Sequence, residues 1–391
     1  MKICILGNEN LNDTFQWEIV VSKYSQEIEW QVINLCAYDW LEKIIDGNYD
    51  LFLAKPPGVT QRFKQLYDER LYILKTELGI KVYPTLKEVL IYENKRFLSF
   101  WLAANNIPHP FTWIFYNKEE ALNFINNYKN YPIVGKINIG AAGKGIKFLN
   151  NKKEALIYIQ RSFSKQGLKS RWYPYVKKGF LLTRIKRFVK NKSYRNQRLS
   201  IYKAIYDESQ KGFIILQEYI PHEYEWRVVR IGDSFFAHKK LKRGEKASGT
   251  LIKEYGKPPF DLLYFVKEIT DRHQLYSQSV DIFESDRGYL INEMQCIFGQ
   301  SDPYQMLING IPGRYIMIEG KWQFEEGDFN TNESYREGVF VAKETERDET
   351  DALFRNYANS LASIGRIAYV LNCGWLGTND ESGMHIEGGW L

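Results

Sequence analysis

Residues 132–147 read PIVGKINIGAAGKGIK, which joins lysines to a glycine-rich turn. A short apolar strand is expected to end at Lys136. The turn that follows contains Gly140, Gly143, Lys144 and Gly145. Glycines allow the backbone to turn tightly and to approach a ligand closely, and free N–H groups beside lysines suit phosphate oxygens. The turn alone could equally shape an ordinary hairpin, so the predicted phosphate cradle depends on the rest of the chain.

A second candidate site lies in residues 279–295, SVDIFESDRGYLINEMQ. This pattern predicts two strands joined by a tight turn at residues 284–288. Side chains two residues apart share one face of a strand, so Glu293 and Gln295 point the same way, and pairing can bring Asp281 beside them. Two carboxylates and an amide oxygen suit Mg²⁺ when phosphates complete its shell. The alternative is a solvated hairpin with ordinary acidic residues.

The order of these features along the chain resembles the ATP-grasp superfamily, in particular its carboxylate–amine ligases. The resemblance rests on Lys95, Lys136, the turn 140–145, Gln217–Ile220, Glu225–Arg227, Asp281 and Glu293–Gln295. It covers about residues 93–300. It implies an α/β fold with α+β lobes, a nucleotide site between two lobes and a parallel α/β domain before them. Two departures are the glutamine at 295, where the family usually has asparagine, and a turn that lacks serine.

The resemblance also implies a role for each residue. It assigns the α- and β-phosphates of ATP to Lys95 and Lys136, and the ribose hydroxyls to Glu225. The hinge strand that meets adenine would comprise Gln217, Glu218, Tyr219 and Ile220, and the Mg²⁺ ligands would be Asp281, Glu293 and Gln295. Candidates for contact with the γ-phosphate or an acyl phosphate are Arg227, Lys239 and Lys240, each of which can also be read as a surface charge.

Length and composition predict several packed units. The chain has 391 residues, more than one core usually supports, and its 44% hydrophobic content suits folded domains. Strands expected at 2–7, 30–35, 50–54 and 81–83, with helices at 15–24 and 62–78, indicate a parallel sheet over residues 1–92. Nucleotide-binding lobes are expected over 93–330. Residues 331–391 are expected to form a helical and strand extension that packs on the main body.

The segment 155–206 holds fourteen Lys or Arg and no Asp or Glu, with ten aromatic residues interleaved. One interpretation is a solvated or disordered basic arm. The other is a docking surface for a polyanion or an acidic partner, for which RNA, an acidic peptide, an anionic glycan or nucleotide-linked sugar, and an anionic membrane surface all remain open. No signature of a nucleic-acid-binding module is present.

Other features of the sequence bear on the cellular compartment and on the roles of the cysteines and histidines. No apolar run is long enough to span a bilayer, and the first residues do not read as a secretory signal. The four cysteines lack metal or disulfide spacing, so we expect a reducing cytoplasm and, for Cys296, a core thiol. The five histidines show no zinc spacing, and His238, beside Lys239, is the one whose surroundings call for inspection. The loops 55–59 and 241–250 could face substrate or be ordinary connections, and a dimer is plausible.

These observations predict a Mg²⁺- and ATP-dependent ligase that joins a carboxylate to an amine and releases ADP. Two alternatives remain open at this point: a phosphotransferase of the same superfamily, and a nucleotide-binding module without turnover. The substrates are expected to be small molecules or peptides, and the sequence does not identify them.

Overall fold

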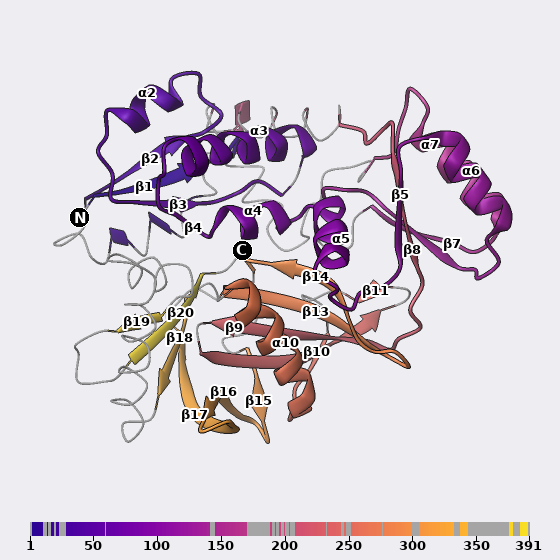
Figure 1. Cartoon of the computed structure of the whole chain (residues 1–391). Coiled ribbons are helices and arrows are strands. Elements are labelled where there is room, and N and C mark those ends of the chain that lie inside the picture. Colours follow the sequence, from indigo (N-terminus) through magenta and orange to yellow (C-terminus); the bar gives the residue numbers. More distant parts are fainter. Residues whose placement is uncertain are drawn as a thin grey trace.

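The computed structural model of the chain describes residues 2–10, 29–58, 60–140, 145–169, 208–231, 233–243, 252–275, 277–298 and 305–331, with short stretches elsewhere. Three sheets organise these residues (Figure 1). The predicted α/β fold with separate lobes is confirmed by this arrangement. Most of the basic segment 155–206 and of the extension 331–391 lies outside the described residues, so the predictions made for them stay predictions.

The first sheet is parallel, with strand order β2-β1-β3-β4. Its strands are β1 (Lys2–Gly7), β2 (Glu29–Asn34), β3 (Leu51–Ala54) and β4 (Val82–Tyr83). Its helices are α2 (Trp40–Ile45), α3 (Gln61–Tyr72) with its π-helical continuation η1 (Ile73–Glu77), and α4 (Leu86–Ile91). Every residue of β3 is buried, as expected for a strand covered on both faces. The predicted strands agree within one residue, whereas the helix expected at 15–24 lies largely outside the described residues.

The second sheet is antiparallel, with strand order β5-β8-β6-β7. Its strands are β5 (Thr112–Phe115), β6 (Ile133–Lys136), β7 (Ile146–Leu149) and β8 (Ile214–Glu218). Two helices, α6 (Lys118–Asn127) and α7 (Lys152–Ser162), pack against it through a shared apolar cluster that includes Ile125, Ile133 and Ile159. Strand β6 therefore holds Lys136 at the end of a buried strand, as the sequence predicts.

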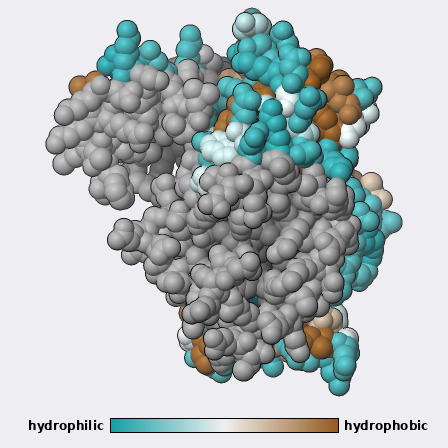
Figure 2. All heavy atoms as spheres, turned by 90° about the vertical axis from the view of Figure 1, so that its left-hand side faces the viewer, coloured by the Kyte–Doolittle hydropathy of each residue, from teal (hydrophilic) through white to brown (hydrophobic). Residues whose placement is uncertain are grey.

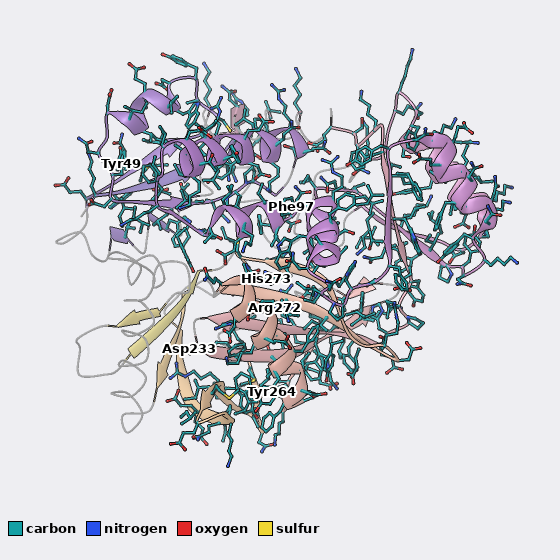
Figure 3. The ribbon with its side chains drawn as sticks, in the orientation of Figure 1. Tyr49, Phe97, Asp233, Tyr264, Arg272 and His273 are labelled. Atoms are coloured by element: carbon teal, nitrogen blue, oxygen red, sulfur yellow. The ribbon has the colours of Figure 1, made fainter. Side chains whose placement is uncertain are left out.

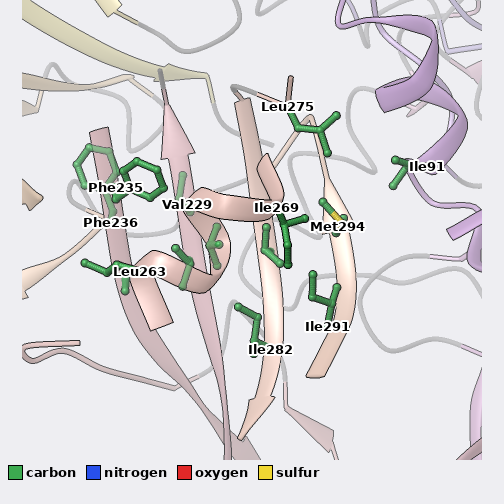
Figure 4. Close-up of a cluster of buried hydrophobic side chains, with 14 of the residues drawn as sticks. Ile91, Val229, Phe235, Phe236, Leu263, Ile269, Leu275, Ile282, Ile291 and Met294 are labelled. Atoms are coloured by element: carbon green, nitrogen blue, oxygen red, sulfur yellow. The ribbon is translucent and has the colours of Figure 1, made fainter. Parts of the chain in front are cut away.

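The third sheet has twelve strands, and its main path runs β14-β13-β9-β10-β16-β17-β18-β20-β19. The strands that matter for the site are β9 (Tyr224–Ile231), β10 (Ser234–Arg243), β13 (Ser277–Ser285) and β14 (Gly288–Gln295). The others are β11 (Lys246–Ala247), β12 (Lys253–Glu254), β15 (Leu307–Ile308), β16 (Ile311–Ile318), β17 (Lys321–Thr331), β18 (Glu337–Ala342), β19 (Trp375–Gly377) and β20 (Met384–Gly389). Helix α10 (Phe260–His273) packs against one face through Leu263 and Ile269 (Figure 4).

Helix α5 (Lys95–Ala104) joins the parallel sheet to the lobes (Figure 1). Its N-cap is Asn94, whose side chain accepts a hydrogen bond from the Phe97 N–H, so the helix starts at Lys95. The preceding residue, Glu93, has φ of 51°, a left-handed conformation that is uncommon for a residue with a side chain. The Asn94 cap thus fixes the residue at which α5 starts, and it places Glu93 just before the helix and Lys95 at its first position.

Within the part of the chain that the structure describes, no helix is long and apolar enough to cross a membrane. In Figure 2, the coloured residues on the side that faces left in Figure 1 are mostly hydrophilic, with some hydrophobic ones among them near the top. The strands of the C-terminal extension that are described, β18 to β20, continue the third sheet from β17. The boundaries at residues 92 and 330 stay predictions.

Candidate active site

One face of the third sheet carries a row of charged side chains across four strands. His238 on β10 lies opposite Arg227 on β9, Arg227 lies opposite Asp281 on β13, and Asp281 lies opposite Glu293 on β14. We call this the polar face. The opposite face of the same strands packs on α10 (Figure 4). Antiparallel pairing therefore brings together residues that are up to 66 positions apart in the sequence.

A β-bulge on β14 adds a residue that simple alternation would not place on the polar face. The register shifts between Asp281 and Ile282, so Asn292 has no direct partner on β13. Ile291 and Met294 consequently both join the hydrophobic cluster, although they are three residues apart (Figure 4). Asn292 accepts a hydrogen bond from the Lys136 Nζ at 3.0 Å and donates to Glu225 at 3.3 Å. The three-residue spacing of the apolar residues Ile291 and Met294 breaks the alternation of a regular strand and is the only trace of this bulge in the sequence.

Asp281 is the centre of a buried ion-pair network. Arg227 donates from Nε to Asp281 Oδ1 at 2.8 Å and from Nη2 to Oδ2 at 3.0 Å, and Lys240 Nζ lies 2.6 Å from Oδ2. Lys240 also lies 2.8 Å from Glu225 Oε2. Burial alone would raise the pKa of Asp281, but Arg227 and Lys240 lower it further than burial raises it. The carboxylate is therefore ionised, and both its oxygens already accept bonds from the two cations.

Lys239 lies apart from this network. Neighbouring residues of a strand point to opposite faces, so Lys239 faces away from the side that holds Lys240. Its Nζ pairs with Glu254 at 2.9 Å and lies over the rings of Tyr224 and Trp226. The structure brings Arg227 and Lys240 together with the candidate metal ligands and does not bring Lys239 there.

Two lysines reach the polar face from other elements. Lys136 is buried at the end of β6, and its Nζ meets Asn292. Lys95, at the start of α5, donates to the Gly140 carbonyl at 2.9 Å and lies 3.9 Å from Glu293 Oε1. Burial first, and then the charge of Lys95, lowers the pKa of Lys136 to about 8. Positive charge therefore accumulates where the second sheet meets β14.

The glycine turn is described at both of its ends. Gly140 accepts the bond from Lys95, while Gly145 has φ of 78° and an added Cβ would lie 2.2 Å from Ile137 Cγ1. Gly145 therefore requires glycine in this conformation. Gly143 and Lys144 lie outside the described residues. The turn starts beside the two lysines, as predicted, and the path of its middle part stays a prediction.

The predicted hinge strand is β8 with the residues that follow it. Gln217 donates to Thr112 at 2.9 Å, Glu218 pairs with Arg287, and the Tyr219 hydroxyl accepts a bond from Lys242 at 3.1 Å. These three side chains are thus engaged with neighbouring protein groups. Ile220 instead forms a small buried apolar cluster with Phe283 and Leu290. Phe283 and Leu290 are site residues that sequence reasoning missed.

Glu93, which the sequence analysis also missed, lies beside the candidate metal ligands. Gln295 donates from Nε2 to Glu93 Oε1 at 3.0 Å, and Lys95 lies 3.9 Å from Glu93 Oε2. Burial raises the pKa of Glu93, and the charge of Glu293 raises it further. Lys95 opposes both effects, and the pKa of Glu93 lies at about 7. The only signal was its position directly before the N-cap of α5.

The side chains around Glu293 provide some of the oxygen ligands that a magnesium ion needs. Among the described residues, no group of three or more His, Cys, Asp or Glu side chains is arranged to hold a metal. Glu293 is partly exposed, and the Gln295 amide turns its nitrogen to Glu93, which leaves its oxygen directed elsewhere. One carboxylate and one amide oxygen suit Mg²⁺, which usually takes one or two protein ligands plus phosphates and water. Direct ligation by Asp281 stays a prediction, and it requires the bonds to Arg227 or Lys240 to rearrange.

Comparison with known proteins finds one whose sequence is similar to this chain. No family model matches the chain. The chain is 26% identical over 275 residues to the alpha-aminoadipate–LysW ligase LysX of Saccharolobus solfataricus, which covers 69% of this chain and 84% of that protein.

Solved structures of similar shape include a RimK domain ATP-grasp protein from Sphaerobacter thermophilus, at 13% identity and a TM-score of 0.46 over 75% of this chain and 90% of that one. Another is the D-alanine–D-alanine ligase of Bacillus anthracis complexed with ATP, at 14% identity and a TM-score of 0.44 over 76% and 85%. The lysines, the polar face and the acidic hairpin occur in the order on which the ATP-grasp resemblance rests, and the similarity to a curated ligase agrees with that resemblance.

Proposed function

We propose that the protein is an ATP- and Mg²⁺-dependent ligase that activates a carboxylate as an acyl phosphate and joins it to an amine, with release of ADP. The observation that carries this proposal is the approach of Lys95, from helix α5, to Glu293 and of Lys136, from the second sheet, to Asn292. Burial and then the charge of Lys95 lower the pKa of Lys136, and an anion placed beside both lysines would relieve this unfavourable environment. The nucleotide triphosphate is the anion that this superfamily places there.

Each part of the site has a role in this reaction. The apolar cluster of Ile220, Phe283 and Leu290 offers a surface for adenine, and Glu225 offers acceptors for ribose hydroxyls. Lys95 and Lys136 bind phosphate oxygens, and Glu293 with the Gln295 oxygen would hold Mg²⁺. Bound Mg²⁺ would supply positive charge to the phosphates.

Arg227 and Lys240 are candidates for stabilising the phosphoryl group and the acyl phosphate. Their ion pairs with Asp281 hold both cations in place before substrate arrives. Charges fixed in advance stabilise developing charge without reorganisation at the moment of reaction. The relative is named as a ligase of alpha-aminoadipate and LysW, which supports a carboxylate and an amine as the two substrates here.

The reaction is tested by its products. We expect phosphate and ADP to form from ATP only when both Mg²⁺ and a carboxylate substrate are present. A panel of amino acids, dicarboxylates and peptides, with hydroxylamine as a general nucleophile, would trap the acyl phosphate as a hydroxamate. Formation of AMP and pyrophosphate, or of a stably phosphorylated product without amide formation, would contradict the ligase mechanism.

Metal affinity is expected to depend on Glu93 through Gln295. Glu93→Met removes the acceptor that orients the Gln295 amide, so we expect the affinity for Mn²⁺ in the presence of a non-hydrolysable ATP analogue to fall about tenfold. The matched variant Glu93→Gln keeps an acceptor oxygen and is expected to stay within about threefold of wild type. Electron paramagnetic resonance titration of Mn²⁺ measures both values. Equal affinity for the two variants would contradict this role.

A further inference from the structure

His238 is a buried residue at the end of the charged row, and nothing in the proposed reaction has used it so far. Its side chain is on the same face as Arg227, its partner across the β9–β10 pairing, and the residue is 1% exposed. The Tyr255 ring lies 5.6 Å from the imidazole, between ring centroids. Directly opposed residues of antiparallel strands have Cβ atoms about 5 Å apart, so the imidazole lies beside the guanidinium.

The hydrogen bonding of His238 determines which nitrogen carries the proton. Nδ1 lies 2.9 Å from the Gln305 carbonyl oxygen. Because a carbonyl can only accept, Nδ1 carries the hydrogen and Nε2 carries a lone pair. Burial first, and then the charge of Arg227, lowers the pKa of His238 to about 3, so the ring is neutral. The side chain thus presents one fixed acceptor.

That acceptor has no partner among the described residues. The atoms buried without a hydrogen bond include His238 Nε2, the Gln305 side-chain Nε2 and Ser279 Oγ. Buried polar groups in folded proteins are nearly always hydrogen-bonded, since an unmet bond costs free energy. His222 offers a contrast within the same region: its Nδ1 also meets a carbonyl, of Ile220, but its Nε2 lies 4.0 Å from Glu225. The buried, unmet acceptor of His238 therefore indicates a place for a polar ligand that can donate a hydrogen bond.

The charges nearby select the kind of ligand. A neutral nitrogen lone pair recognises an N–H or O–H group, and the neighbouring Arg227 disfavours a second cation. A neutral amine satisfies both conditions. We propose that His238 Nε2 forms the subsite for the amino group of the nucleophile and holds it unprotonated beside Arg227. This inference rests on the proposed ligase function and names one of its two substrate sites.

The chemical step then balances without a further reactant. The amine lone pair attacks the carbonyl carbon of the acyl phosphate, a C–N bond forms, and the C–O bond to phosphate breaks with its electron pair on phosphate. The nitrogen loses one proton, and the released phosphate takes it up as hydrogen phosphate. His238 accepts a hydrogen bond from an amine N–H and directs the nitrogen lone pair toward the acyl carbon, so it acts as a binding residue and needs no change of protonation.

The test separates amine binding from carboxylate activation. His238→Leu replaces the ring by an apolar side chain, whereas His238→Gln places an amide oxygen near the position of Nε2. With the carboxylate identified in the hydroxamate assay, and glycine amide and methylamine as amine probes, we expect His238→Leu to raise the KM for amine about tenfold and His238→Gln to restore it to within about threefold. Hydroxylamine is itself an amine, so its KM in the hydroxamate assay is expected to rise in His238→Leu as well, while the KM for the carboxylate stays within about threefold of wild type.

A second measurement does not depend on turnover. The chain has five histidines, so the ¹⁵N signals of the imidazoles can be assigned by substitution. Titration of the wild-type protein, in the presence of a non-hydrolysable ATP analogue, with glycine amide is expected to shift the Nε2 signal of His238 and not that of His273. His273 is a matched control, because its Nε2 is also without a partner among the described residues but lies at the end of α10, away from the polar face (Figure 3).

The outcomes distinguish the two proposals. If the wild type yields neither ADP nor hydroxamate with any carboxylate, the ligase function fails. If the wild type is active but His238→Leu leaves the amine KM unchanged, or if the His238 signal does not move on titration, the amine subsite is overturned while the ligase function stands. An equal rise in the KM for amine and the KM for carboxylate in a folded His238→Leu protein would also overturn it.

Discussion

Replacement of Glu293 by alanine is expected to lower the rate of ADP release by about 10³-fold. Glu293 is the carboxylate on the polar face whose nearest described cation, Lys95, is 3.9 Å away, so it remains available to a metal. Its loss would leave the phosphates without that ligand and would leave Lys95 without a carboxylate partner on β14. The rate is measured by coupling ADP release to NADH oxidation at saturating ATP and Mg²⁺.

A matched control for this prediction lies in the same hairpin. Glu284 accepts bonds from the Tyr224 hydroxyl at 2.8 Å and from Trp226 Nε1 at 3.2 Å, next to the turn between β13 and β14. Glu284→Ala removes a carboxylate from the hairpin without touching the candidate metal ligands, and its turnover is expected to stay within about threefold of wild type. Turnover of Glu293→Ala at the rate of this control would refute the assignment.

Replacement of Asp281 by alanine is expected to reduce the free energy of unfolding by about 3–5 kcal/mol. The substitution leaves Arg227 without both of its hydrogen bonds and Lys240 with Glu225 alone, in an environment that excludes water. A buried charge without its partner is much more costly than a surface charge. Urea unfolding followed by tryptophan fluorescence measures the change.

The control is the exposed ion pair between Lys239 and Glu254, which lies away from the polar face. Glu254→Ala breaks its contact with Lys239, in which the Glu254 side chain is 53% exposed, and is expected to cost less than about 1 kcal/mol. The stabilisation by Asp281 is also expected to depend on pH in one direction. Because the folded pKa lies below the unfolded value of about 3.9, the stabilisation is complete above that value and is lost as the pH falls below it. Equal costs for the two variants at pH 7 would show that Asp281 is not the anchor of the network.

Much of the site followed from local patterns. The apolar run before Lys136 and the turn between β13 and β14 each depend on residues close in sequence, and the structure has them as predicted. The order of these segments was enough to indicate the ATP-grasp resemblance, because that superfamily builds its nucleotide site from the same kinds of segments in the same order. Local sequence could not show that Asp281 is already paired with two cations.

Residue types and chain order determined the parallel first sheet, the strand that carries Lys136, the acidic hairpin and the chemistry these can support. Tertiary structure alone decided that Lys239 faces away, that Asn292 and Glu93 join the site, and that His238 presents an unmet lone pair. The physical reason is that strand register, a one-residue bulge and the contact between separate sheets depend on partners outside the local segment, as far as 156 residues away for Lys136 and Asn292. Such partners leave no periodic trace in the segment they orient.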